Sequence, residues 1–181
     1  MKTQQQQAIE ARWSDPRQRE AASQRMKVAW RRKEPRAFLI LFGQGLHDEQ
    51  NLLKWHLDSQ KQLLLGDVYK DNWTFANHGV EPGDEIFLMR TGKPRAPRLI
   101  GHGFATSEIY TTTHWLYPEK EDDYADVEFD VFNLIGPPVV PLATLKTLPA
   151  QKTWTPNGSG IEIRAAAATT LRWLWANATQ S

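Results

Sequence analysis

Three of the eight tryptophans in this 181-residue sequence stand among polar or turn-forming residues: Trp73, Trp115 and Trp154. An aromatic ring in such a setting can stack on a nucleobase that has left its helix, and stacking is worth about 1–3 kcal/mol per base. Packing in the protein core is the alternative for each of these rings. For the other tryptophans considered, core or helix packing is the better interpretation; these are Trp55, Trp173 and Trp175.

Residues that could support hydrolysis are present but scattered. The five histidines form no pair with metal-ligand spacing, and the sequence has no cysteine. His47-Asp48-Glu49 is typical of a helix start with early acids. Ser159 lies in a Gly-Ser-Gly sequence without the strand–turn–helix elbow of a serine nucleophile, so a tight turn explains it better. We therefore expect no catalytic residue, no cofactor and no metal site.

Basic residues concentrate at the amino terminus. Residues 1–36 hold ten Lys and Arg against four acids, a net charge of +6, whereas residues 37–181 hold twelve against seventeen, a net charge of −5. Such a segment either contacts nucleic-acid phosphates or forms a solvated helix. In the first interpretation the contacts come from Arg12, Arg17, Arg25, Arg31, Arg32 and Lys33.

The elements that position these residues follow from the apolar pattern. Asp15 and Pro16 suit the start of a helix, and a narrow apolar stripe continues it to about Arg32. Pro35 disfavours helix in the residue before it, which marks a boundary. The chain is therefore divided into a basic helical arm at residues 1–35 and a domain at residues 36–181.

The domain mixes strands and helices. Strands are expected at residues 37–42, 85–90, 98–106, 124–132 and 160–163, helices at 48–57 and 165–178, and a strand or loop at 67–75. Pro82-Gly83 favours a type II turn, and Gly101 and Gly103 suggest close packing. In residues 124–132, Ala125, Val127, Phe129 and Val131 should share one face. The pattern predicts an α+β fold with a curved antiparallel sheet, closed towards a barrel and flanked by helices.

An ordered series of short motifs runs through the domain. It comprises Asp71-Asn72-Trp73, the turn at 80–84 with its strand, Pro97-Arg98-Leu99-Ile100-Gly101, His114-Trp115 and Trp154-x-Pro156-x-x-Ser159-Gly160. Over roughly residues 37–176 the series resembles the EVE-like domains of the PUA superfamily, especially those fused to HNH endonucleases that restrict modified DNA. Leu99 is a departure, because members of that family usually carry glycine after the Pro-Arg pair, and a leucine would narrow the approach of backbone to ligand. Residues 12–16 and 26–30 resemble the short helical DNA-binding modules of homing endonucleases.

This resemblance implies a PUA-like barrel that holds a flipped, modified base in a concave pocket at one mouth. The pocket residues are then expected among Trp73, Arg90, Arg98, Trp115, Trp154 and Ser159. The expected ligand is DNA with a modified base, modified cytosine first, bound in restriction or defence with or without a partner nuclease. Two other functions stay open: a reader of modified RNA, as in the related YTH and PUA domains, and a hydrolase acting on modified nucleosides.

The composition also bears on location. Without cysteine there is no disulfide scaffold, and the glutamine-rich start does not resemble a signal peptide. No apolar run approaches the roughly 20 residues that cross a bilayer. We therefore expect a cytoplasmic protein that does not associate with membranes.

Overall fold

The structure is a computed structural model that describes residues 35–43, 49–76, 79–92, 97–135, 139–148, 151 and 153–179. The helix expected at residues 15–32 lies outside this part of the chain. So do the six basic residues assigned to phosphate contacts, which stay predictions: Arg12, Arg17, Arg25, Arg31, Arg32 and Lys33.

The described chain confirms the α+β class. Its elements are β1 (Ala37–Gly43), α3 (Glu49–Leu64), β2 (Tyr69–Thr74), β3 (Glu85–Thr91), β4 (Arg98–Ala105), β5 (Tyr110–Thr113), β6 (Glu121–Phe132), β7 (Val140–Pro141), α4 (Leu142–Leu145), β8 (Ile161–Ile163) and α5 (Ala165–Thr179). Every strand expected from the apolar runs is present, and residues 67–75 contain a strand. The polar β5 and the short β7 and α4 were not expected, because their sequences carry no periodic apolar signal.

One mixed sheet contains all the strands described. Its order is β2-β6-β4-β3-β1-β8, with β5 paired to β6 and β7 paired to β4. The expectation of an antiparallel sheet is wrong for β1 and β3, which are parallel along their whole length. The chain between them passes through α3 and β2, which is long enough for the crossover that a parallel pair needs. Within the described residues no strand ladder joins β2 to β1 or β8, so the sheet is open and not a closed barrel.

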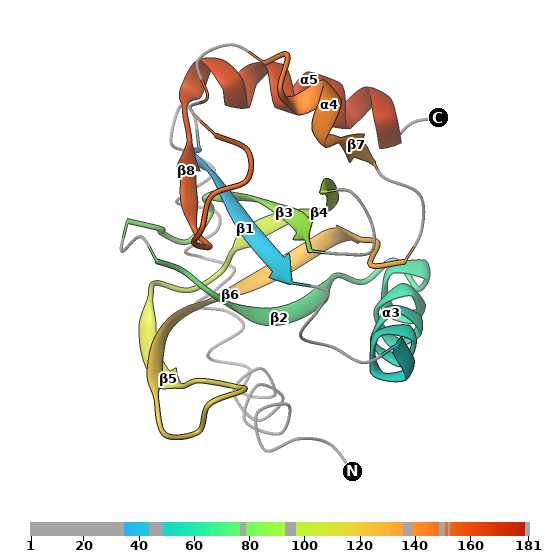
Figure 1. Ribbon diagram of the computed structural model, residues 1–181. Coiled ribbons are helices and arrows are strands. Elements are labelled where there is room, and N and C mark those ends of the chain that lie inside the picture. Colours follow the sequence, from blue (N-terminus) through green and yellow to red (C-terminus); the bar gives the residue numbers. More distant parts are fainter. Residues whose placement is uncertain are drawn as a thin grey trace.

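The two ends of this open sheet nevertheless approach one another. Just beyond β2, the Ala76 N–H donates to the carbonyl of Ser159, which precedes β8, over 2.8 Å. Figure 1 shows the resulting curl, with α4 and α5 over one side of the sheet and α3 beside β2.

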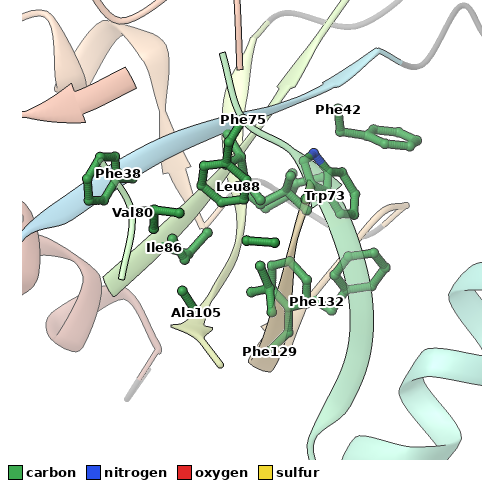
Figure 2. Close-up of a cluster of buried hydrophobic side chains, with 14 of the residues drawn as sticks. Phe38, Phe42, Trp73, Phe75, Val80, Ile86, Leu88, Ala105, Phe129 and Phe132 are labelled. Carbon is green, nitrogen blue, oxygen red and sulfur yellow. The ribbon is translucent and has the colours of Figure 1, made fainter. Parts of the chain in front are cut away.

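Alternation along the strands divides the buried side chains into two cores. The first core lies inside the curl and receives Phe38, Ile40 and Phe42 from β1 (Figure 2). The second core lies against α4 and α5 and receives Ala37 and Leu39 from the same strand. The curled sheet is therefore apolar on both faces, which explains why β1 reads as a continuous apolar run.

The expected alternation along β6 fails near its end. Ala125, Val127 and Phe129 lie in the first core as predicted, but Val131 packs against the second core and Phe132 enters the first. The cause is a bulge, since Gly103 pairs with Phe129 whereas His102 pairs with Val131, leaving Asp130 as an extra residue. The sequence pattern carries no sign of this extra residue.

Two glycines have the roles that the sequence suggests. Gly83 has a φ of 90° in a turn closed by the Asp84 N–H bonding to the Glu81 carbonyl, as a type II turn requires. At Gly103 a Cβ atom would stand 2.2 Å from the Glu128 carbonyl oxygen, so only glycine allows β4 to approach β6 this closely.

Helix α5 packs one face on the second core. Leu171 and Trp175 are buried there, whereas Leu174 is partly buried. The expectation that Trp173 packs in the core is wrong, because it lies two residues from each of Leu171 and Trp175, on the opposite side of the helix, and is 66% exposed.

A partly buried ionic network, centred on His102 and Glu85, holds α5 against the sheet. The ring of His102 lies between two carboxylates, with Nδ1 2.7 Å from Asp130 Oδ1 and Nε2 3.0 Å from Glu85 Oε1. Arg172 of α5 donates to Glu85 over 2.6 Å and to the carbonyl of Pro35 over 2.8 Å. Burial alone would lower the pKa of His102, but the hydrogen bonds to both carboxylates outweigh it and raise that pKa to about 9. With both ring nitrogens engaged, His102 serves structure and is not available as a general base.

None of the described helices has the length and apolar character needed to cross a membrane.

Candidate functional site at the seam between β1 and β2

Strand β1 has an edge that no neighbouring strand fully covers. β8 pairs with it only from Ala37 to Leu39. Beyond that point two side chains satisfy Leu41: its N–H donates to Ser159 Oγ over 3.1 Å, and its carbonyl accepts from Trp73 Nε1–H over 3.1 Å. This region, where β1 faces β2, is here named the seam; it comprises Leu41, Phe42, Trp55, Tyr69, Asp71, Trp73 and Ser159.

Trp73 lies at the centre of the seam but is not open to solvent. Its side chain points inward from β2, as Figure 2 shows, and only 8% of the residue is exposed. Trp55 stacks on it with ring centroids 6.1 Å apart and an interplanar angle of 27°. Phe129 and Phe132 meet it edge-on at 5.8 and 6.3 Å. A base could stack on Trp73 only after Trp55 had left.

Trp55 comes from α3, a helix beside β2 and β6 that keeps most of its residues outside the core. Of the sixteen residues of this helix, only Leu52 and Ser59 are buried. An open groove of about 410 Å³ lies between α3 and the end of β6, and the Gln60 side chain crosses it to donate to the Phe132 carbonyl. The helix is therefore held mainly by Leu52, Trp55, Ser59 and Gln60.

Below the stacked rings lies a polar pair that sequence reasoning missed. Tyr69 and Asp71 share the inward face of β2 with Trp73, because side chains alternate along a strand. Trp55 Nε1–H donates to the Tyr69 hydroxyl, which in turn donates to Asp71 Oδ2 over 3.2 Å. Burial raises the pKa of Asp71 to about 7, against the opposing effect of hydrogen bonds from the Asn72 N–H and Tyr69. The signal available in the sequence was the alternation of Tyr69, Asp71 and Trp73.

The two arginines assigned to the pocket lie at the same end of the sheet as the seam. Phe42 of β1 is in register with Arg90 of β3, and Arg90 with Arg98 of β4. Arg90 is fully buried and its Nη1–H donates to the Leu134 carbonyl over 3.1 Å, while Arg98 is 9% exposed. The alternative that these are surface or turn residues is wrong for both. Their charges lie inside the protein, where they do not contact phosphates.

Trp154 and Trp115 lie away from the seam. Trp154 belongs to the second core and is 4% exposed, which agrees with the core-packing alternative. Trp115 is 40% exposed in the connection between β5 and β6, where it stacks on His114 with ring centroids 6.1 Å apart. The structure thus brings Trp73 and Ser159 together at Leu41, and it places Arg90 and Arg98 at the same end of the sheet but on the strands across β1.

Leu99, which departs from the resembled pattern, faces away from this end. Its side chain is fully buried in the second core, whereas the seam opens from the first. The leucine therefore does not narrow the seam.

The geometry offers little for hydrolysis. Ser159 Oγ accepts a hydrogen bond from the Leu41 N–H, a contact that positions the loop before β8. No group of three or more His, Asp and Glu side chains is placed to hold a metal ion among the described residues.

Comparison with known proteins gives no family. No protein-family model matches this sequence, and no curated protein is significantly similar to it. Among solved structures, one described as "Structure of Hypothetical protein from Leishmania major" is similar over 81% of this chain and 99% of that chain. The identity is 15% and the TM-score is 0.49, a level of likeness that carries no inference about function.

Proposed function

We propose that this chain is an EVE-like module of the PUA superfamily that binds DNA containing a modified base, with the seam as the site of the flipped base. The ordered motifs along residues 37–176 suggest this family. The open, curled sheet would correspond to its barrel.

One observation carries the proposal. Trp73 and Ser159, which are far apart in the sequence, bond to the carbonyl and the N–H of the same residue, Leu41. Arg90 and Arg98 are register partners on the adjoining strands. Side chains from two separate motifs therefore meet at the uncovered edge of β1, while the two arginines lie on the strands beyond its other edge.

The chemistry of the seam suits a flat, partly polar ligand. Aromatic walls from Phe42, Trp55 and Trp73 lie beside the hydroxyl and carboxyl groups of Tyr69 and Asp71. A flipped base needs this combination, with stacking on its faces and hydrogen bonds along its edge.

The basic arm would supply the affinity that does not depend on the base. A net charge of +6 over residues 1–36 allows several contacts with phosphates, each releasing counterions. Such contacts do not distinguish modified from unmodified DNA, so specificity would come from the seam. Cleavage, where it occurs, would come from a partner nuclease.

Modified RNA is the second candidate ligand, because the same stacking site would accept a base from either polymer. DNA is preferred on the resemblance of both the domain and the arm to parts of endonucleases.

The test is a binding titration by fluorescence anisotropy at fixed salt. Labelled DNA and RNA of equal length would carry cytosine or 5-methylcytosine at one central position. The full chain should bind the modified DNA most tightly. Trp73→Phe, which keeps an aromatic ring but loses the bond to Leu41, should reduce the preference for the modified base, whereas Trp173→Phe on the exposed face of α5 should not. Equal binding to all four oligonucleotides would refute base recognition.

The arm needs its own test. Because the Pro35 carbonyl accepts a bond from Arg172, the deletion should remove residues 1–34 and keep Pro35. The shortened protein should stay folded, bind DNA more weakly and show a shallower dependence of log Kd on log salt concentration. An unchanged slope would identify the arm as a solvated helix.

A further inference from the structure

The indole of Trp55 has the contacts that a bound base would need. It stacks on the ring of Trp73, with a centroid separation of 6.1 Å. Its Nε1–H, which lies in the ring plane, donates to the hydroxyl of Tyr69. Indole is a flat heteroaromatic ring system with an in-plane N–H donor; it is as large as a purine, so the space that it fills also admits the smaller cytosine ring.

The Tyr69 hydroxyl, which accepts this N–H, is oriented by Asp71. The Tyr69 hydroxyl donates a hydrogen bond to Asp71 Oδ2 over 3.2 Å, so its oxygen lone pairs can accept one. Asp71 is in turn held by the Asn72 N–H, which donates to Oδ1 over 2.9 Å. The acceptor therefore keeps its orientation when the donor leaves.

We propose that Trp55 occupies the base-binding site, and that a base with an exocyclic amino group replaces it by stacking on Trp73 and donating to Tyr69. This inference rests on the proposed function and specifies its ligand: an N–H donor at the edge of the base is required. For a modified cytosine the donor is the amino group at N4.

The attachment of Trp55 allows the exchange. Most of α3 is exposed or partly buried, so few contacts besides those of Leu52, Trp55 and Gln60 would have to break for the indole to leave. When Trp55 leaves, its contacts with Trp73 and Tyr69 are replaced by those of the base, while its ring contacts with Phe42 and Phe132 are lost. The net affinity for a base is therefore lowered by the stability of the Trp55 contacts.

The first experiment changes Trp55. Trp55→Leu keeps apolar volume on α3 but removes the indole, and thermal unfolding would establish that the variant is folded. It should bind the 5-methylcytosine oligonucleotide at least about 5-fold more tightly than the unaltered chain, the lower end expected for losing one competing stacked ring. Trp115→Leu, which removes an exposed tryptophan elsewhere, is the matched control and should leave the Kd unchanged.

The second experiment changes the acceptor and the donor together. In the Trp55→Leu background, where no indole competes for the hydroxyl, Tyr69→Phe should weaken binding of the 5-methylcytosine oligonucleotide by about 3- to 10-fold, as expected for one hydrogen bond. An oligonucleotide with N4,N4-dimethylated 5-methylcytosine has no amino N–H. It should bind Trp55→Leu more weakly than the 5-methylcytosine oligonucleotide does, and adding Tyr69→Phe should not weaken it further.

The outcomes distinguish a failure of this inference from a failure of the proposed function. If the chain prefers modified DNA but Trp55→Leu binds it equally or less well, Trp55 is a wall of the site and the exchange is refuted. If Tyr69→Phe weakens both oligonucleotides equally, the donor assignment is refuted. If neither the unaltered chain nor Trp55→Leu distinguishes the oligonucleotides, the proposed function falls and this inference with it.

Discussion

Truncating Trp73 should destabilise the protein strongly, whatever its part in binding. The ring contacts Phe42, Trp55, Phe129 and Phe132 in the first core, and its Nε1–H satisfies the Leu41 carbonyl. Replacing a buried tryptophan with alanine costs about 3–5 kcal/mol of unfolding free energy, because packing is lost and a cavity remains. Domains of this kind have only about 5–15 kcal/mol in total, so Trp73→Ala should unfold easily.

Trp73→Phe separates the ring from the hydrogen bond. It keeps most of the aromatic packing and leaves the Leu41 carbonyl without its donor, which should cost about 1–3 kcal/mol. Urea unfolding, followed by tryptophan fluorescence and by far-ultraviolet circular dichroism, would give the loss of unfolding free energy for Trp73→Ala and for Trp73→Phe. The comparison holds where the slope of free energy against urea concentration is equal between the variants. A cost below about 1.5 kcal/mol for Trp73→Ala would contradict the placement of this ring in the core.

Three further predictions concern the scaffold. Because the pKa of His102 is raised to about 9, its contribution to stability should be complete below pH 6.5 and disappear as the pH rises through 9. The free energy of unfolding, measured with urea, should fall by up to about 3 kcal/mol over this range, and His102→Gln should remove most of that fall. Gly103→Ala should lower the free energy of unfolding by about 3 kcal/mol or more, because the added Cβ meets the backbone of β6. Gly158→Ala is the control: its added Cβ would have its nearest contact at 3.4 Å, so the same assay should show a loss below about 1 kcal/mol. Trp175→Ala should lower the free energy of unfolding by about 3–5 kcal/mol and Trp173→Ala by no more than about 0.5 kcal/mol; similar losses for the two would contradict the orientation of α5.

Local patterns predicted the elements well and their assembly less well. Apolar runs located β1, β3 and β4, because these strands are buried on both faces. The parallel pairing of β1 with β3 and the open edge of the sheet depend on contacts between distant segments, which no local pattern records. The bulge at Asp130 likewise arises where two strands meet, so the alternation along β6 could not reveal it.

The site was predictable only in part. Polar neighbours drew attention to Trp73 and Trp154 alike, yet the structure buries both, one in each core. The residues that flank a tryptophan in the sequence do not determine which side chains its ring packs against in the fold. Tyr69 and Asp71 were missed because a short polar strand can equally be a loop, and only the strand places them beside Trp73.

The most direct test of base binding at the seam is a two-dimensional ¹H–¹⁵N NMR titration of the tryptophan indole groups. Each of the eight indole N–H signals can be assigned by one Trp→Phe variant. On addition of the 5-methylcytosine oligonucleotide, the signals of Trp55 and Trp73 should shift most, because one loses its acceptor and the other changes its stacking partner. Those of Trp154 and Trp173 should stay in place. Shifts confined to tryptophans outside the seam, or no shift at all under conditions where the DNA binds, would contradict the account.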